Sequence, residues 1–365
     1  MIFIKDIIDT IKKKNITFFT GVPDSILKNL PKELKNNHIS VNNEGTAISL
    51  AAGYYLSTKK IPCVYLQNSG LGNAINPLIS INHKNVYSIP SLLIIGWRGS
   101  PNSYDEPQHK AKGKITKDIL KLLGIKYCIL RNKKDLKNLK NLIEYSKKKL
   151  TSVACLIERS RIESKKSSIK KIQANNHKIL RYDFIKELVK SINKRTNLIS
   201  STGFTSRELD NILIKNLYPK IRPFYMVGGM GHTASLTLGI SLKSKKQNIC
   251  LDGDGSLLMH TGSLGLIKKF GGKRFRYILL RNNSHESVGD QTTNSNHINF
   301  KMLSKSFDFS SYYLINEKKN MKKILKKFIN CSGPAFLEVR IKSGSIKNLG
   351  RPKNLKMIKK KFMLG

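Results

Sequence analysis

The chain has 365 residues, of which 39% are hydrophobic, and its mean hydropathy is −0.31, so it is long enough for two soluble domains of ordinary size. No apolar run approaches the length that spans a bilayer, which excludes a membrane-spanning protein. The net charge of +44 by itself suggests a nucleic-acid or anionic membrane partner. Because the lysines are spread along the chain, and because Lys, Asn and Ile are all abundant as in AT-rich coding, we expect neither partner.

Residues 1–15 predict a first helix, since Ile4, Ile7, Ile8 and Ile11 share one helical face. The segment lacks the uninterrupted apolar core and small-residue cleavage site of a signal peptide. Five cysteines are scattered along the chain without metal-type pairs, and we expect buried thiols in a reducing cytoplasm.

Strand-like and helix-like runs alternate along both halves of the chain. In the first half we expect strands at 17–21, 39–42, 61–67, 92–96 and 153–158, and helices at 25–35 and 44–56. In the second half we expect helices at 182–193, 233–242 and 260–270, and strands at 197–201, 249–251, 277–280 and 335–341. Both halves therefore predict α/β domains with doubly wound parallel sheets and no middle domain.

The domain boundaries follow from composition. Residues 163–178 are polar and basic and predict a linker. We expect a first domain at 1–162, a second domain at 179–345 and a basic C-terminal tail at 346–365.

A carboxylate and a pair of amides follow two neighbouring predicted strands. Gly253-Asp254-Gly255 follows the apolar run at 249–251, and Asn282-Asn283 follows the run at 277–280. A helical crossover between the strands would bring both groups to one edge of a parallel sheet, where ligands bind. A carboxylate, an amide oxygen and a carbonyl suit Mg²⁺ bound through a phosphate, which the glycines let backbone N–H groups approach.

This arrangement resembles the diphosphate-binding motif of thiamine diphosphate enzymes, whose minimal plan is two similar α/β domains. The resemblance implies thiamine diphosphate and Mg²⁺ as cofactors. It implies Asp254, Asn283 and the main-chain carbonyl of His285 as metal ligands. Relatives often carry one more residue before this histidine, so the carbonyl could instead be that of Ser284. The cofactor-binding residues that it implies are Asn68, Thr202, Gly203, Gly228, Met230, Gly255 and Ser256, with Met230 as the bulky residue that bends the cofactor.

Glu44 begins a helix of small residues directly after the predicted strand at 39–42. The helix dipole alone would favour an acid at this position. The segment also resembles the glutamate-bearing helix of thiamine diphosphate enzymes, which implies that Glu44 bonds the pyrimidine ring of the cofactor.

Further motifs resemble the phosphonopyruvate decarboxylase family and span nearly the whole chain. The most discriminating motif runs from Trp97-Arg98-Gly99 to Asp105-Glu106-Pro107-Gln108-His109. Others are Gly21-Val22-Pro23-Asp24-Ser25, Gln67-Asn68-Ser69-Gly70, Ser206-Arg207-Glu208-Leu209 and His285-Glu286-Ser287-Val288-Gly289. The sequence departs from the family at Asp290 and at Thr292, where Gly and Pro are usual.

The resemblance implies decarboxylation of 3-phosphonopyruvate to phosphonoacetaldehyde and CO₂ in phosphonate biosynthesis. Asp24, Asp105 and His109 are its candidates for acid–base catalysis. Arg98 would pair with the phosphonate, since arginine suits bidentate oxyanion recognition. Gln108 and Glu286 are further candidates for substrate binding.

Members of this superfamily place the cofactor between the first-type domain of one chain and the second-type domain of another. A homodimer or larger oligomer is therefore implied, with Glu44 and Asp254 meeting at an interface. The alternatives are a sulfopyruvate or other 2-oxo acid decarboxylase, a cofactor-binding relative without activity and, more distantly, a nucleic-acid binder. The last leaves the Asp254 and Asn283 arrangement unexplained.

Overall fold

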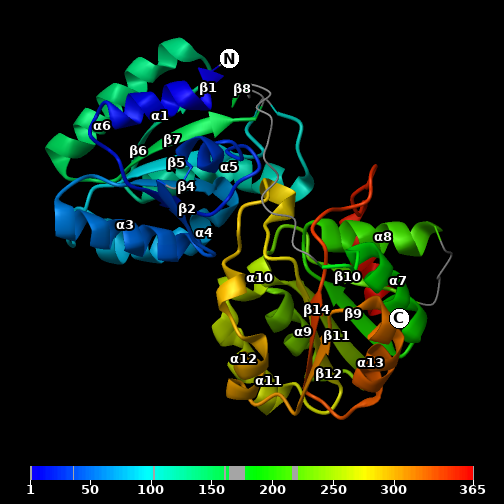
Figure 1. Ribbon diagram of the computed structural model, residues 1–365. Coiled ribbons are helices and arrows are strands. Elements are labelled where there is room, and N and C mark those ends of the chain that lie inside the picture. Colours follow the sequence, from blue (N-terminus) through cyan, green and yellow to red (C-terminus); the bar gives the residue numbers. More distant parts are fainter. Residues whose placement is uncertain are drawn as a thin grey trace. The chain divides into compact units, whose positions relative to one another are not determined.

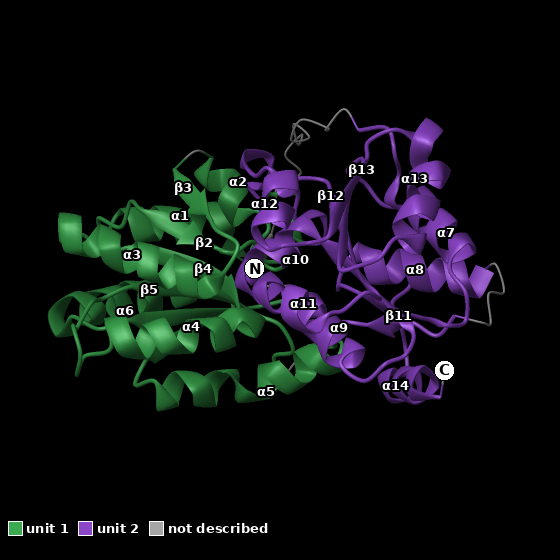
Figure 2. Ribbon diagram, turned by 90° about the horizontal axis from the view of Figure 1, so that it is seen from below, with its two compact units in different colours: residues 1–170, 288–291 green, residues 171–287, 292–365 purple. Residues whose placement is uncertain are grey.

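A computed structural model describes residues 2–35, 37–101, 103–159, 162–163, 177–215 and 221–364. The chain forms two compact units, of which unit 1 contains residues 1–170 and 288–291 and unit 2 contains residues 171–287 and 292–365 (Figure 2). The division falls within the predicted linker, whose residues 164–176 lie outside the described part of the chain.

Unit 1 is built on a six-stranded sheet of order β3-β2-β4-β5-β7-β6, and all of its neighbouring strands are parallel. Its strands are β2 (Phe19–Gly21), β3 (His38–Ser40), β4 (Cys63–Gln67), β5 (Leu92–Trp97), β6 (Lys126–Leu130) and β7 (Val153–Glu158). A separate parallel pair joins β1 (Ile2–Phe3) to β8 (Ile162–Glu163). The helices are α1 (Ile4–Lys12), α2 (Leu30–Leu34), α3 (Glu44–Thr58), α4 (Leu71–Pro77), α5 (Pro107–Leu122) and α6 (Leu136–Lys149), with short turns η1 (Asn68–Gly70), η2 (Leu78–Asn82) and η3 (Lys133–Asp135).

Helices cover both faces of this sheet. Successive side chains on a strand point to opposite faces. In β4, Cys63 and Tyr65 pack in a cluster with α1, α2 and α6, whereas Val64 and Leu66 pack in a cluster with α3, α4 and α5. Figure 1 shows α1 and α6 on one side of the strands and α3 and α4 on the other. Burial on both faces explains why the central strands read as continuous apolar runs.

Unit 2 has a second six-stranded parallel sheet, of order β10-β9-β11-β12-β14-β13. Its strands are β9 (Thr196–Ser200), β10 (Phe224–Tyr225), β11 (Gln247–Gly253), β12 (Phe275–Arg281), β13 (Ser311–Ile315) and β14 (Ala335–Arg340). Its helices are α7 (Arg181–Ser191), α8 (Phe204–Lys215), α9 (Thr233–Ser241), α10 (Asp254–Met259), α11 (Gly265–Phe270), α12 (Phe300–Ser306), α13 (Lys318–Asn330) and α14 (Leu355–Met363), with short turns η4 (Thr261–Leu264), η5 (Glu286–Val288) and η6 (Ser295–His297).

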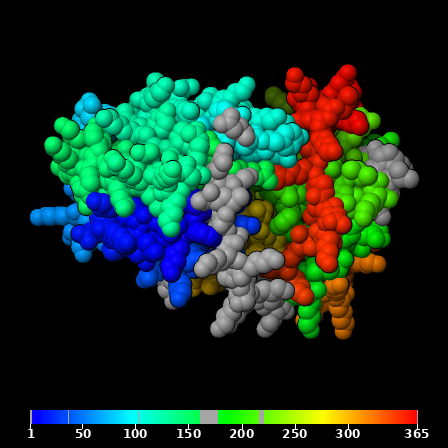
Figure 3. All heavy atoms as spheres, turned by 90° about the horizontal axis from the view of Figure 1, so that it is seen from above, coloured from blue at the N-terminus to red at the C-terminus, as the bar shows by residue number. Residues whose placement is uncertain are grey.

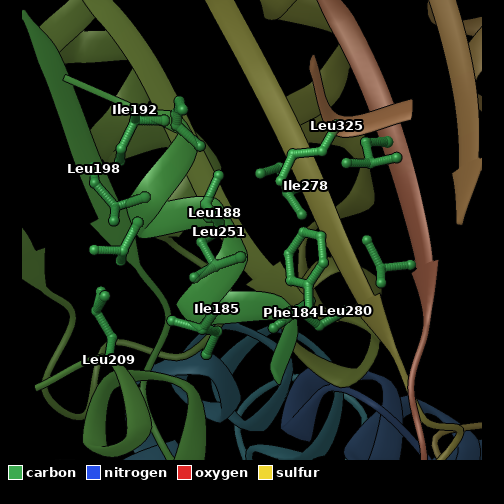
Figure 4. Close-up of a cluster of buried hydrophobic side chains, with 14 of the residues drawn as sticks. Phe184, Ile185, Leu188, Ile192, Leu198, Leu209, Leu251, Ile278, Leu280 and Leu325 are labelled. Atoms are coloured by element: carbon green, nitrogen blue, oxygen red, sulfur yellow. The ribbon is translucent and has the colours of Figure 1, made fainter. Parts of the chain in front are cut away.

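The core of unit 2 also has two layers. Helices α7, α8 and α13 pack on one face of the sheet, where Ile185 and Leu188 of α7 lie beside Leu251 of β11 (Figure 4). Helices α9, α11 and α12 pack on the other face. The C-terminal segment, red in Figure 3, lies on the surface of this unit, where Phe362 of α14 meets Phe224 of β10 edge to face.

The two sheets share one topology. If the strands of each sheet are numbered along the chain, their order across the sheet is 2-1-3-4-6-5 in both units. The order therefore reverses between β2 and β4 in unit 1 and between β9 and β11 in unit 2. Ligands of open α/β sheets bind at the carboxyl ends of strands at such a reversal. Both predicted parallel sheets are confirmed.

Some expected elements differ in extent. The helix expected at 25–35 is only α2 (Leu30–Leu34), because the Asp24 carboxylate accepts the backbone N–H of Leu27 and holds the preceding residues in a turn. The helix expected at 260–270 is divided into η4 and α11. No helix in the described part of the chain is long and apolar enough to cross a membrane.

Candidate active site

In unit 2, a pocket of about 90 Å³ lies around the carboxyl ends of β9, β11 and β12. Asp254, the first residue of α10, is only 3% exposed and lines this pocket. Burial raises the pKa of its carboxyl, although donors from Ser295, Thr293 and two backbone N–H groups favour the charged form. The pocket is also lined by Thr202, Gly203, Met230, Gly255, Ser256 and His285, all predicted from the sequence.

Oxygen atoms crowd around the Asp254 carboxylate. Its Oδ2 lies 2.9 Å from Thr293 Oγ1 and 2.6 Å from Ser295 Oγ, and the hydroxyl of Ser295 is also 2.6 Å from Asn283 Oδ1 and 3.0 Å from Thr293 Oγ1. Two hydroxyl protons cannot fill these four contacts, so oxygen lone pairs face one another. A surplus of oxygen lone pairs fits a hard cation such as Mg²⁺.

The two adjacent asparagines have different surroundings. Asn283 has a φ of +60°, and its Oδ1 accepts a hydrogen bond from Arg281 Nε at 3.0 Å. Among the described residues, Asn282 lines the pocket with Asp254 and Asn283 does not. The Oδ1 atom of Asn282 accepts the N–H of Ser284 at 3.0 Å. The resemblance implies Asn283 as the metal ligand, whereas the neighbouring Asn282 is the asparagine that lines the pocket.

His285 packs against Gly255. A Cβ on Gly255 would lie 2.6 Å from Cε1 of the His285 ring, so the second glycine of the motif cannot carry a side chain without a shift of this ring. Burial lowers the pKa of His285 to about 4, which leaves the imidazole neutral at physiological pH. Its Nε2 has no hydrogen-bond partner among the described residues. Ser284 and His285, whose carbonyls are the predicted metal ligands, both line the pocket.

The glycine turn that carries Met230 is hydrogen-bonded to two other segments of the pocket, at Thr202 and at Ser256. The N–H of Gly231 donates to Ser256 Oγ at 3.0 Å, and the N–H of Gly228 donates to Thr202 Oγ1 at 3.3 Å. Gly228 has a φ of +77°, in the left-handed region that glycine adopts without strain. The turn thus positions Met230, the residue expected to bend the cofactor, in the pocket wall.

Glu286, predicted to bind substrate, lines the pocket and is bonded to two other residues of unit 2. Its Oε2 accepts from Arg181 Nη1 at 2.6 Å, and its Oε1 accepts from the N–H of Gly344. Arg181 was not singled out by any sequence motif, although it lines the same pocket.

In unit 1, polar side chains gather at the carboxyl ends of β2, β4 and β5. Asp24 is 1% exposed and accepts hydrogen bonds from Gln67 Nε2 and from the backbone N–H of Leu27. Burial raises the pKa of Asp24, and the hydrogen bond from Gln67 partly opposes this effect. A Cβ on Gly96 would clash with the Asp24 carboxylate, so this glycine makes room for the acid.

Arg98 and Asp105 form a bidentate ion pair. Nε of Arg98 donates to Asp105 Oδ2 at 2.6 Å and Nη2 donates to Oδ1, while Nη1 donates to Ser25 Oγ at 2.9 Å. Burial would raise the pKa of Asp105, but the Arg98 guanidinium and the N–H of Glu106 hold it well below its usual range. Three of the five guanidinium N–H groups are used in these bonds.

Glu44 begins α3, is 5% exposed, and its Oε2 accepts from Asn73 Nδ2 at 2.7 Å. The side chain rests over Gly70, where a Cβ would lie 2.0 Å from its Oε1. Burial raises the pKa of Glu44, while Asn73 and the positive charge of Lys112 act in the opposite direction. A buried carboxyl with a raised pKa can hold a proton toward a ring nitrogen.

The other predicted residues of unit 1 lie near this cluster. Asn68 Nδ2 donates to the carbonyl of Arg98 at 2.9 Å, and Asn68 Oδ1 accepts the N–H of Arg98 at 3.0 Å. These bonds position the end of β5. Gln108 and His109 lie in the first turn of α5 and are half-buried, and Gln108 Oε1 has no hydrogen-bond partner among the described residues.

Both units therefore carry a buried carboxylate at the carboxyl edge of a doubly wound sheet. No group of three or more His, Cys, Asp or Glu side chains in the described ranges could hold a metal ion. A metal at Asp254 would need amide, carbonyl and ligand oxygens, which is the ligand set of Mg²⁺ on a phosphate. These features define a protein of two α/β domains, each with a candidate ligand site at the carboxyl edge of a doubly wound sheet.

Comparisons with known proteins agree with that class. Residues 1–158 match the N-terminal TPP binding domain of thiamine pyrophosphate enzymes, and residues 214–339 match the C-terminal TPP binding domain; thiamine pyrophosphate is another name of thiamine diphosphate. The chain is 28% identical to "Phosphonopyruvate decarboxylase" of Streptomyces viridochromogenes, over 97% of this chain and 92% of that protein.

Sulfopyruvate decarboxylases are also similar. The protein of that name from Methanosarcina acetivorans is 28% identical over 93% of this chain and 91% of its own length. "Sulfopyruvate decarboxylase subunit beta" of Methanococcus maripaludis is 32% identical over 38% of this chain and 72% of that subunit. The chain belongs to the thiamine pyrophosphate enzymes, and its relatives named phosphonopyruvate decarboxylase and sulfopyruvate decarboxylase identify it as a carboxy-lyase, a carbon–carbon lyase.

Proposed function

We propose that this protein decarboxylates 3-phosphonopyruvate to phosphonoacetaldehyde and CO₂ in phosphonate biosynthesis, with thiamine diphosphate and Mg²⁺. The observation that most supports this proposal is the pair of buried carboxylates, Glu44 in unit 1 and Asp254 in unit 2. Both lie where a doubly wound sheet binds ligands.

Unit 2 would bind the diphosphate end of the cofactor. Asp254, the amide of Asn282 or Asn283 and a carbonyl of Ser284 or His285 would hold Mg²⁺. Thr202, Gly203, Gly255 and Ser256 would contact the diphosphate, and Met230 would set the bend of the cofactor. When bound, thiamine diphosphate supplies the electron sink for decarboxylation.

Unit 1 would supply the carboxyl of Glu44 to the pyrimidine end and the groups that handle the substrate. Asp105 holds Arg98 in a fixed orientation, and the guanidinium N–H groups not used in that pair would bind the phosphonate. Gln108 would bind the substrate and His109 would act in proton transfer, since both lie at the start of α5 close to Asp105 in the chain.

Asp24 is the stronger candidate for returning a proton after CO₂ leaves. Its raised pKa keeps a fraction of the Asp24 carboxyl protonated at pH values where an ordinary aspartate is ionised. The lowered pKa of Asp105 keeps the carboxyl of Asp105 ionised. Asp105 therefore fits a role in holding Arg98 better than a role as proton donor.

The proposed assembly is a homodimer or larger oligomer, in which a second copy completes each active site. Relatives named as alpha and beta subunits of sulfopyruvate decarboxylase support an oligomeric organisation. The five free cysteines suit the reducing cytoplasm in which we place the enzyme.

Sulfopyruvate is the second candidate substrate, because a protein named sulfopyruvate decarboxylase is similar over 93% of this chain. The cofactor requirement is tested first by removing thiamine diphosphate and divalent cations from the purified protein and measuring CO₂ release from phosphonopyruvate after each is returned. We expect release only when both are present. Release without thiamine diphosphate would refute the proposal, and release without a divalent cation would refute its metal component.

A further inference from the structure

Three segments distant in sequence meet at Arg181, the first residue of α7. Its Nε and Nη2 donate to the two carboxylate oxygens of Glu208 at 3.1 and 3.3 Å, and its Nη1 donates to Glu286 at 2.6 Å. Nη2 also donates to the carbonyl of Gly344 at 3.3 Å, and the N–H of Gly344 donates to Glu286. Arg181, Glu208 and Glu286 thus form a triad, in which Glu208 and Glu286 come from two of the motifs singled out in the sequence.

The triad is buried. The side chain of Arg181 is 5% exposed, that of Glu208 is 1% exposed and that of Glu286 is 5% exposed. Removing one partner of a buried ion pair leaves an uncompensated charge, so each member is strongly constrained. The planar guanidinium can serve two carboxylates at fixed angles, which a lysine ammonium cannot do in the same geometry.

Glu286, one member of the triad, is part of the pocket wall. Glu286 lies between His285 and Ser287, and all three line the pocket around Asp254. Arg181 itself lines the pocket and lies over the ring of Phe204, 5.5 Å from its centroid. The position of the 284–287 segment therefore depends on a bond that comes from helix α7.

We propose that Arg181 is a positioning residue for the cofactor pocket, because through Glu286 it fixes the segment that carries the proposed carbonyl ligand of the metal. Glu208 orients the guanidinium from the other side. This inference rests on the proposed binding of Mg²⁺ and thiamine diphosphate. Arg181 would not touch the metal but would hold the segment that does. Loss of such a supporting contact lowers metal affinity about 10- to 100-fold.

The test is calorimetric titration of thiamine diphosphate at several Mg²⁺ concentrations into the full-length protein, together with its thermal midpoint. We expect Glu286→Gln and Arg181→Lys to weaken binding about 10- to 100-fold. Asp183→Asn is the matched control, since it removes the exposed ion pair with Lys318 from the same helix and should leave binding unchanged.

Glu208→Gln separates positioning from general stability. It disturbs the buried triad without changing a residue of the pocket segment, so it should lower the thermal midpoint as Glu286→Gln does but weaken binding at least threefold less. Affinities that fall in proportion to the midpoints, or wild-type affinity in folded Glu286→Gln protein, would overturn the inference. The comparison of Glu208→Gln with Glu286→Gln tests the positioning role even if Arg181→Lys does not fold. Failure of the wild-type protein to bind would instead count against the proposed function.

Discussion

The Arg98 guanidinium and the Asp105 carboxylate bind each other through two parallel hydrogen bonds, and both side chains are buried. The pair joins the end of β5 to the loop before α5. Because the pKa of Asp105 is held well below its usual range, its carboxyl group stays ionised in the folded protein at neutral pH. The same pair gives Arg98 the fixed orientation that recognition of an oxyanion requires.

Asp105→Asn should destabilise the protein by about 3–5 kcal/mol, because it leaves the buried Arg98 charge without its partner. Chemical unfolding measures the loss. Glu144→Gln is the control, since its ion pair with Lys14 is exposed and should contribute at most about 1 kcal/mol.

The same pair predicts that the free energy of unfolding decreases at acid pH. The folded-state pKa of Asp105 is depressed, so its contribution is fully present above the unfolded-state pKa of about 4 and is lost as the pH falls below that value. The unfolding midpoint of Asp105→Asn should therefore depend less on pH in this window. An identical decrease at acid pH in the variant would contradict the assignment.

Asp24→Asn should lower kcat by about 10²- to 10⁴-fold if Asp24 transfers the proton. Because burial raises the pKa of Asp24, the active protonated form is lost as the pH rises through that raised value, which lies above the usual range near 4. Rates of CO₂ release measured against pH should show this falling limb in the wild-type protein and not in the variant. Asp9→Asn, on the exposed face of α1, is the control. A full rate in Asp24→Asn would assign the proton to another group.

Glu44→Gln should reduce CO₂ release by at least about 10²-fold, because an amide cannot exchange a proton with the pyrimidine ring. Binding of thiamine diphosphate, followed by calorimetry, should persist within an order of magnitude, since Gln preserves the packing over Gly70 and the contact with Asn73. Glu33→Gln, at an exposed position of α2, should behave as wild type. Activity of Glu44→Gln within threefold of wild type would remove Glu44 from the mechanism.

The two asparagines at the end of β12 should differ in their effect on metal affinity. Asn282 lines the pocket, whereas the amide oxygen of Asn283 is bonded to Arg281 and lies against Ser295. Asn282→Ala should raise the half-saturating Mg²⁺ concentration about 10-fold or more, and Asn283→Ala should have the smaller effect. The opposite order would restore Asn283 as the ligand.

For Asn283, the sequence predicted the neighbouring residue but not the backbone conformation. Its pairing with Asp254 was predicted, and the backbone N–H of Asn283 does donate to Asp254 Oδ2 at 2.8 Å. Its left-handed φ of +60° could not be read from the sequence, because asparagine adopts both backbone conformations. The one signal in the sequence is that a single residue, Ser284, separates Asn283 from His285.

Strand content was predicted best where both faces are buried. β4, β5, β7 and β11 are continuous apolar runs and were all expected. The edge strands β6 and β13 are only half-buried and were not expected, since an exposed edge places little constraint on side chains. The Arg181 triad was also missed, because its members are separated by 27 and 105 residues and no local pattern joins them.

The central claim is tested most directly by kcat/KM for CO₂ release from phosphonopyruvate, sulfopyruvate and pyruvate, measured side by side with saturating thiamine diphosphate and Mg²⁺. The account predicts that phosphonopyruvate is preferred by at least about 10-fold and that phosphonoacetaldehyde appears in equal amount to CO₂. Preference for sulfopyruvate would contradict the proposed substrate while keeping the decarboxylase. No turnover of any of the three, in protein that binds the cofactor, would contradict the proposed reaction itself.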